Sequence, residues 1–330
     1  MARGAAAKSD TRQARIRSIS AHLIRRHGGR VQRVLVRGGF GCPNRDGRAG
    51  YGGCTFCDFT ATWAARTDER PGVAAQIADG IARIGPRSGA RRFLAYFHDG
   101  SATDAPVARL AALYREALAQ PGVVGLAVGT RPDCLPDTVL DLLADLNRRA
   151  ELWLEIGLQS ACDATLQRVN RGHDVRCFED AVRRAHERGL AICAHVVLGL
   201  PGEDRSHARA TAELLTRLSV EGVKLHNFHV LTGARCADDF RAGRIRVPGL
   251  SEYALLAADF LERIPPVVVI HRLAASARSE RLVAPDWTAD RWAGRQAVLD
   301  ELEHRDSWQG STLGADAGDV LRSLEGGEPC

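Results

Sequence analysis

Short apolar runs with the length of β-strands alternate with amphipathic segments along most of this chain. The amphipathic segments show the spacing of a helix face, as Val73, Ile77 and Ile81 do in the first of them. A chain that repeats strand and helix forms a parallel sheet, because each helix returns the chain to the end where the next strand starts. The sequence therefore predicts an α/β protein with a partial or full βα barrel. The predicted strands lie within residues 31–38, 91–100, 123–130, 152–160, 190–200 and 222–230.

Three regions follow from this pattern. The barrel is predicted to span residues 31–240, because no linker interrupts the repeats there. Residues 1–30 form an N-terminal extension, and residues 241–330 form a C-terminal extension that we expect to pack on the barrel. Within the C-terminal extension, the apolar run 265–273 predicts one more strand, and we expect a final helix from Thr288.

Composition limits the class of protein and its compartment. The chain has 330 residues, 45% of them apolar, which is enough for a substantial core. The polar, Arg-rich N-terminus lacks a secretory signal and no stretch has the length of a membrane span, so we expect a cytoplasmic protein without a membrane partner. Nine cysteines in such a protein are expected to be thiols or metal ligands rather than disulfides. A net charge of +5 gives only slight support to nucleic acid as a partner.

Three of these cysteines, Cys42, Cys54 and Cys57, stand in a glycine-rich segment directly after the first predicted strand. We call residues 38–57 the cysteine loop. In a βα barrel, the chemistry lies at the carboxyl ends of the strands, where this loop begins. A disulfide, a zinc ion or an iron–sulfur cluster could use these thiols, but a zinc site lacks a nearby fourth ligand before His98. The spacing favours a [4Fe–4S] cluster with three protein ligands and one open iron.

Further motifs along residues 31–292 carry a family resemblance. With them, the chain resembles the radical SAM superfamily, and within it the stand-alone bacterial proteins related to the radical SAM domain of the Elongator catalytic subunit. The resemblance implies a partial (β/α)6 TIM-type barrel with a C-terminal α/β extension, and it implies a [4Fe–4S] cluster and S-adenosylmethionine (SAM) as cofactors. The motifs are GGFGCPNRDG, GGCTFCDF, VGTRPDCLPD, LEIGLQS, RVNRGHD, AHVVLGLPGE, VKLHNFHV and HRLAASARSERLVAPDW.

The resemblance also implies which side chains contact SAM. Phe56 stands where the family has an aromatic residue beside the adenine. Gln159 and Arg171 match positions that contact SAM in related oxygen-independent coproporphyrinogen oxidases, and a guanidinium suits the methionyl carboxylate. Glu155 and His195, expected at the ends of the fourth and fifth strands, could hydrogen-bond the ribose or act on the substrate. The plainer alternatives are an ion pair for Glu155, a surface charge for Arg171 and a core position for His195.

Three more cysteines, Cys134, Cys162 and Cys236, follow predicted strands and are expected in loops at the mouth of the barrel. They could ligate an auxiliary iron–sulfur cluster, as in radical SAM enzymes that insert sulfur. The alternative is that they are separate half-buried thiols, because cysteine is often buried for packing alone. One of them could also donate a hydrogen atom to a substrate radical.

Three functions remain open from the sequence. The first is a radical SAM enzyme that forms a 5′-deoxyadenosyl radical and abstracts hydrogen from an unreactive carbon of a nucleoside, RNA or related small molecule. Such an enzyme needs an external electron donor such as flavodoxin or ferredoxin. The second is sulfur insertion into a nucleoside-type small molecule with an auxiliary cluster as the donor. The third is a non-catalytic tRNA-binding protein with a structural metal.

Overall fold

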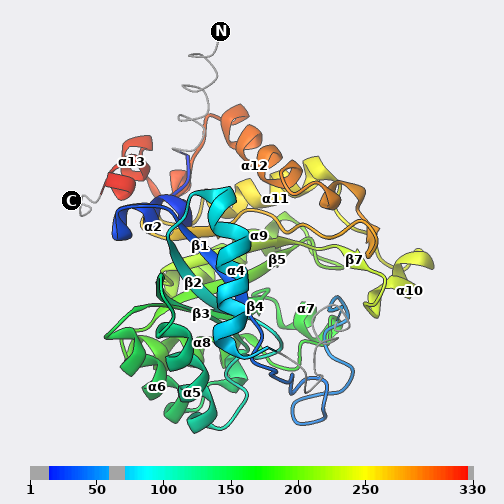
Figure 1. Ribbon diagram of the computed structural model, residues 1–330. Coiled ribbons are helices and arrows are strands. Elements are labelled where there is room, and N and C mark those ends of the chain that lie inside the picture. The colour runs from blue at the N-terminus through cyan, green and yellow to red at the C-terminus, as the bar shows by residue number, and fades with distance from the viewer. Residues whose placement is uncertain (1–14, 59–70, 326–330) are drawn as a thin grey trace.

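A computed structural model describes residues 15–58 and 71–325, and within them the predicted parallel sheet is present (Figure 1). Neighbouring strands pair in the order β1–β2–β3–β4–β5–β6–β8, and each of these pairings is parallel. This result confirms the α/β class. The strands of this sheet are β1 (Val31–Val36), β2 (Arg92–Phe97), β3 (Val123–Thr130), β4 (Glu151–Gln159), β5 (Ala191–Leu198), β6 (Gly222–Asn227) and β8 (Val269–Arg272).

Helices follow the strands and cover the outside of the sheet (Figure 1). Local signals set their starts. The carboxylate of Asp174 accepts from the backbone N–H of Cys177 at the start of α8, and Asp204 caps α9 in the same way. The helices are α2 (Ile19–His27), α4 (Val73–Ser88), α5 (Val107–Leu118), α6 (Asp137–Asn147), α7 (Asp163–Arg168), α8 (Val175–His186), α9 (Arg205–Arg217), α10 (Cys236–Arg241), α11 (Leu250–Leu261), α12 (Ala293–His304) and α13 (Ala317–Glu325).

The sheet is curled, so that its two edge strands approach each other across the concave face. β1 and β8 lie at opposite edges, yet the guanidinium of Arg33 on β1 is 2.8 Å from the ring of His271 on β8. A flat sheet would hold these residues far apart, because neighbouring strands are about 5 Å apart. The fold is therefore a half-barrel, as expected. Its last strand comes from the predicted C-terminal extension, whose run 265–273 contains β8.

Close packing positions one helix on the outside of this half-barrel and another at the end opposite the cysteine loop. Gly80 lets α4 lie directly on β1, because a Cβ there would be 2.3 Å from a methyl group of Val34. At the end of the sheet opposite the cysteine loop, α2 closes the concave face (Figure 1). Leu23 of this helix is 3% exposed and packs with Trp153 and Val269. The open end of the half-barrel is therefore the end where the strands finish.

The C-terminal region differs in detail from the prediction. The helix expected from Thr288 begins at Ala293, and Thr288 itself lies in the 3-10 turn η2 (Asp286–Ala289). The sequence reading missed α11, which packs between α9 and α12 and is mostly buried. The remaining short elements are the antiparallel pair β7 (Val230–Leu231) and β9 (Leu282–Ala284) and the 3-10 turns η1 (Pro132–Cys134) and η3 (Ser311–Leu313).

The proposed region boundaries at residues 30 and 240 stay predictions, and residues 1–14 and 326–330 of the two extensions lie outside the described part of the chain. Among the helices of residues 15–58 and 71–325, none has the length and apolar character needed to span a lipid bilayer.

Candidate functional site

The cysteine loop leaves the carboxyl end of β1 and folds into consecutive turns. The N–H of Arg45 donates to the carbonyl of Cys42 at 2.9 Å, and the N–H of Cys57 donates to that of Cys54 at 3.1 Å. The two glycines before Cys54 each have φ of +74°, a conformation that glycine adopts without steric cost. Cys54 is buried, and Cys42 and Cys57 are half-buried. The loop therefore holds its three thiols in a compact, partly shielded segment.

The segment between α7 and α8 holds this loop in place. The side chain of Asn44 donates to the carbonyl of Asn170 at 2.7 Å, and the side chain of Asn170 donates to the carbonyl of Gly53 at 2.8 Å. The N–H of Thr55 donates to the carbonyl of Val169 at 2.9 Å. These bonds join the loop after β1 to the region after β4, so both contribute to one site.

The guanidinium of Arg171 contacts a thiol of the loop. Its side chain is buried, with Nη1 3.6 Å from Sγ of Cys54 and Nη2 donating to the carbonyl of Gly157 at 2.7 Å. Gly157 makes this contact possible, because a Cβ there would be 2.5 Å from Nη2 of Arg171. Arg131 supports the arrangement by donating to the carbonyl of Arg171 at 2.9 Å, while Asp133 pairs with Arg131 at 2.8 Å.

Electrostatics indicate that the three thiols share one region. Burial raises the pKa of Cys42, and the charge of Cys54 adds to this effect, while Arg131 and Arg171 oppose it. Burial raises the pKa of Cys57 to about 11, with further contributions from Cys54 and Cys42. Thiols in such a setting hold their protons unless a metal cation replaces them.

The residues present fit an iron–sulfur cluster. Three thiols from one loop supply the ligand type that such clusters take, and two buried arginines beside them oppose the build-up of negative charge. Nε of Arg171 and Oδ1 of Asn44 are buried without a hydrogen-bond partner among the described residues. Polar atoms left in this state beside a thiol indicate that the site is built to receive a further group.

Gln159 lies beside Arg171, and Phe56 stands in the cysteine loop directly before Cys57. Gln159 ends β4 with φ of +81°, at an irregularity in the pairing with β5. Its Nε2 lies 2.7 Å from the point that a Cβ on Gly157 would occupy, so Gln159 and Arg171 meet above the same glycine. Phe56 packs against an apolar cluster that includes Val169. Their predicted contacts with SAM stay predictions, and their positions beside the cysteine loop are compatible with them.

The expectation that Glu155 and His195 lie at strand ends is wrong. β4 continues to Gln159 and β5 to Leu198, so both residues are in the middle of their strands and point into the half-barrel. The carboxylate of Glu155 is fully buried and lies 2.8 Å from Nε2 of His195 and 2.7 Å from Nζ of Lys224. The alternative that Glu155 forms an ion pair describes this geometry.

Glu155 belongs to a larger group that we call the interior charged cluster: Arg33, Tyr96, Glu155, Lys224 and His271. Lys224 donates to the hydroxyl of Tyr96 at 2.6 Å, and Arg33 lies 3.3 Å from the carboxylate of Glu155. Lys224 and Arg33 hold the pKa of the Glu155 carboxyl well below its ordinary value, although burial acts in the opposite direction. Burial lowers the pKa of Lys224 to about 8. The cluster is therefore a set of buried ion pairs across the half-barrel.

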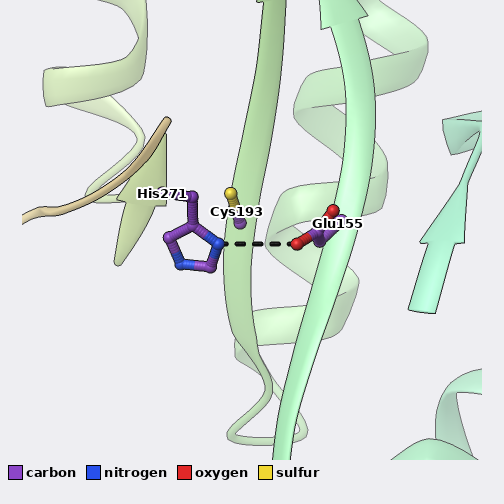
Figure 2. A group of neighbouring side chains, drawn as sticks. All are labelled: Glu155, Cys193 and His271. Atoms are coloured by element: carbon purple, nitrogen blue, oxygen red, sulfur yellow. Dashed lines mark ion pairs between the residues drawn. The ribbon is translucent and has the colours of Figure 1, made fainter. Parts of the chain in front are cut away.

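A metal ion in this cluster is disfavoured. Figure 2 shows Glu155, Cys193 and His271, whose potential ligand atoms all lie within 4.8 Å of one another. Lys224 and Arg33 already neutralise Glu155, and a divalent ion would add positive charge beside them. Burial also raises the pKa of the Cys193 thiol well above its ordinary value. We therefore assign these side chains to the ion-pair network.

The other three predicted cysteines lie in three different settings. Cys134 is buried in η1, where its carbonyl accepts from the hydroxyl of Thr103 at 2.6 Å. Cys162 precedes α7, and a backbone hydrogen bond at Thr165 lowers its pKa. Cys236 is 2% exposed at the start of α10 and packs in the same apolar cluster as Phe56. Their contacts agree with the packing alternative, and the auxiliary cluster stays a prediction without support from these neighbours.

Sequence reasoning overlooked most of the interior charged cluster. Arg33, Tyr96 and Lys224 each stand inside an apolar run, so no local motif marks them. Their spacing carries a signal, because polar residues at alternate positions of a strand point to the same face of a parallel sheet. His226, two residues after Lys224, points to the same face, and its ring lies 5.3 Å from that of His195. The ring of His229 instead contacts the carbonyl of Asn227 at 3.0 Å.

Comparisons with known proteins agree with this fold. The chain is 43% identical over 293 residues to Protein YhcC from Escherichia coli K12, covering 88% of this chain and 93% of that protein. It is 28% identical over 154 residues to human Elongator complex protein 3, covering 46% of this chain and 27% of that protein. The solved structure of archaeal Elp3 from Methanocaldococcus infernus shares the fold with a TM-score of 0.61, at 16% identity, over 84% of this chain and 64% of that one.

Two family models match in succession along the chain. Residues 220–304 match the Radical_SAM C-terminal domain, which includes β8 and α12. Residues 38–215, more than half of the chain, match the Radical SAM superfamily and contain the cysteine loop, Gly157 and Arg171. With its three-cysteine loop at the open end of a parallel half-barrel, the chain belongs to the radical SAM superfamily.

Proposed function

We propose that this protein is an enzyme that reductively cleaves SAM to a 5′-deoxyadenosyl radical, which abstracts hydrogen from an unreactive carbon of a nucleoside, RNA or related substrate. One observation carries the proposal: the cysteine loop brings Cys54 near the end of β4, where the buried guanidinium of Arg171 contacts both the thiol of Cys54 and the carbonyl of Gly157. A zinc site would need a fourth ligand. The charged groups that most affect the pKa of Cys42 and Cys57 are arginines and the other loop cysteines, and the carboxylate of Asp58, the next residue in the chain, pairs with Arg281 at 3.1 Å.

Cys42, Cys54 and Cys57 would hold the [4Fe–4S] cluster, and the cluster when bound supplies the electron that breaks the sulfonium C–S bond of SAM. Arg171 would fix the carboxylate of SAM, because its Nε is buried without a partner and its two other nitrogens are already positioned. Gln159 would bind a polar group of SAM beside it, and Phe56 would provide an apolar contact for the adenine.

An external electron carrier such as flavodoxin or ferredoxin would reduce the cluster. The turns that carry the thiols also carry exposed side chains, with Tyr51 79% exposed and the guanidinium of Arg48 in solvent. A protein partner could therefore approach the thiol region from this side of the loop.

The proposal is tested by anaerobic reconstitution of the full chain. The protein should bind about four irons and form 5′-deoxyadenosine from SAM when reduced with dithionite. The triple variant Cys42→Ala, Cys54→Ala, Cys57→Ala should lose both properties. Cys177→Ala, which removes a half-buried thiol on α8, should keep both.

Two results would contradict the proposal. SAM cleavage by the triple variant would show that the cysteine loop does not hold the cluster. A protein that binds iron or zinc through these thiols but never cleaves SAM would instead fit the structural-metal alternative.

A further inference from the structure

The part of the concave face near the carboxyl ends of the strands is accessible to a ligand. On β1, Val34 and Val36 are 1% exposed, but Leu35 between them is 57% exposed on the opposite, concave face. His98, just after β2, is exposed as well. Between the interior charged cluster and the carboxyl ends of the strands, the half-barrel therefore remains open toward the end where SAM would bind.

Positive charge is in excess on this face. Arg33 and Lys224 both lie beside Glu155, the single carboxylate among the described residues that pairs with them. Arg272 at the end of β8 is a third cation. Its guanidinium lies 3.3 Å from the carbonyl of Leu225, and within residues 15–58 and 71–325 no carboxylate pairs with it.

The side chain that Arg272 contacts is the imidazole of His226, which carries no counter-charge. Nη2 of Arg272 is 2.7 Å from Nε2 of His226, and the His226 ring lies 5.3 Å from that of His195. Burial and Arg272 lower the pKa of His226 well below its ordinary value, and burial lowers the pKa of His195 to about 4. Near neutral pH, both rings are therefore neutral, and the three cations of this face exceed its one carboxylate by two charges.

A partly buried cation without a counter-ion is costly, and an anion from outside removes that cost. We propose that the substrate of this enzyme is a small molecule with a phosphate or carboxylate group, which Arg272 and His226 bind on the concave face. The inference rests on the proposed function and names the chemical class of its substrate. The planar guanidinium offers parallel donors to either anion, and the single N–H of the neutral His226 ring can donate one more hydrogen bond. The single N–H of the neutral His195 ring faces the carboxylate of Glu155.

The position of this site suits hydrogen abstraction. Arg272 and His226 are near the carboxyl ends of β8 and β6, at the end of the sheet that also carries the cysteine loop. An anionic group held there would anchor one end of the substrate inside the half-barrel. The rest of the molecule would extend toward the open mouth, where Arg171 and Gln159 meet.

Binding of simple anions to the full-length protein tests the proposal without any need for the natural substrate. Inorganic phosphate and succinate are titrated separately into the wild-type protein and followed by calorimetry, with glycerol as a neutral control. Arg272→Gln should weaken the binding of the preferred anion by roughly ten- to hundredfold, the usual effect of losing a hydrogen bond to a charged group. Arg246→Gln, which removes an exposed arginine paired with Glu252, should leave it unchanged.

The outcomes separate the two sources of the anion. Tighter binding of phosphate assigns a phosphorylated substrate, and tighter binding of succinate assigns a carboxylate. Equal affinities for wild type and Arg272→Gln would overturn the proposal, and so would the absence of binding by both anions. If Arg272→Gln does not fold, NMR of the wild-type protein decides the question, because bound anion should raise the pKa of His226. An unchanged pKa in saturating anion would overturn the proposal.

A further variant separates this inference from the proposed function. The triple cysteine variant should still bind the anion, because Arg272 and His226 lie outside the cysteine loop, although it should no longer cleave SAM. Anion binding by wild-type protein that never cleaves SAM would refute the proposed function alone. SAM cleavage without anion binding would refute this inference alone.

Discussion

The cysteine loop and the interior charged cluster lie in the same half-barrel but are built in opposite ways. The cysteine loop is one short segment, and hydrogen bonds to the backbone of Val169 and Asn170 hold it in place. The interior charged cluster takes one side chain from each of five strands, and its contacts are between side chains. Its members are Arg33 on β1, Tyr96 on β2, Glu155 on β4, Lys224 on β6 and His271 on β8.

From this difference we expect the interior charged cluster to contribute mainly to stability and the cysteine loop mainly to chemistry. A change in the cysteine loop should remove the proposed cluster and leave the folded chain largely intact, because few core residues depend on the loop. A change in the interior charged cluster should act on stability first, because an unpaired charge would remain inside the fold. Four variants, ordered by the size of the expected effect, test this contrast.

Removal of the central carboxylate should have the largest effect. Glu155→Ala leaves the buried Lys224 and the half-buried Arg33 without their shared partner, which costs about 3–5 kcal/mol of unfolding free energy. Denaturant unfolding of the protein without cofactors measures this loss. The matched control is Glu252→Ala, whose exposed pair with Arg246 should contribute at most about 1 kcal/mol. Equal losses in the two variants would show that the interior charged cluster is not a stabilising centre.

The pH dependence of stability should show the second effect. Burial and the charge of Lys224 lower the pKa of His195 to about 4 in the folded protein. Between about pH 6.5 and pH 4, the unfolded chain therefore binds a proton that the folded chain does not, and stability falls as the pH falls. His195→Gln should remove up to about 3 kcal/mol of this decline, measured as unfolding free energy against pH.

His207 provides a control of opposite sign. Its hydrogen bond with Asp204 raises the pKa of His207, so its contribution to stability is present at low pH and is lost as the pH rises through the folded pKa. His207→Gln should therefore leave the decline between about pH 6.5 and pH 4 in place. A decline that is unchanged in His195→Gln would mean that other groups cause it.

Loss of Arg171 should affect SAM more than the fold. Arg171→Ala should weaken SAM binding by roughly ten- to hundredfold, because the proposed ion pair with the methionyl carboxylate is lost. Iron content should stay near that of wild type, since the cysteines are unchanged. Arg168→Ala removes a neighbouring arginine that contacts the carbonyl of Pro201, and it should not change SAM binding. Unchanged affinity in Arg171→Ala would leave this arginine as a structural contact of Cys54 and Gly157.

The same contrast explains how much the sequence could predict. The strands and the cysteine loop were predictable, because apolar runs and cysteine spacing are local signals. The positions of Glu155 and His195 within their strands were not predictable, because they depend on where each strand ends relative to its neighbours. Register in the folded sheet aligns Glu155 with Cys193 and His195 with Lys224, pairings that no single segment encodes.

Contacts across the half-barrel could not be predicted from the sequence, for a related reason. The 2.8 Å contact of Arg33 with His271 joins residues 238 positions apart, and it arises only when the sheet curls. The role of Gly157 was likewise hidden, because it consists of the space that a missing Cβ leaves for Arg171. Such features follow from three-dimensional packing, whereas the three cysteines of the loop can be read from one segment.

The smallest expected effect tests that space directly. In Gly157→Ala, the new Cβ would lie 2.5 Å from Nη2 of Arg171 and 2.7 Å from Nε2 of Gln159, so both side chains must shift. Because both contacts are with the ends of side chains, the sheet should tolerate the change, and iron content should remain that of wild type. SAM affinity, measured by equilibrium binding to the reconstituted protein, should fall by at most about tenfold, which is less than in Arg171→Ala. Gly249→Ala, where no heavy atom lies within 4 Å of the new Cβ, should have no effect. A normal SAM affinity in Gly157→Ala would show that SAM binding does not require the observed positions of Arg171 and Gln159.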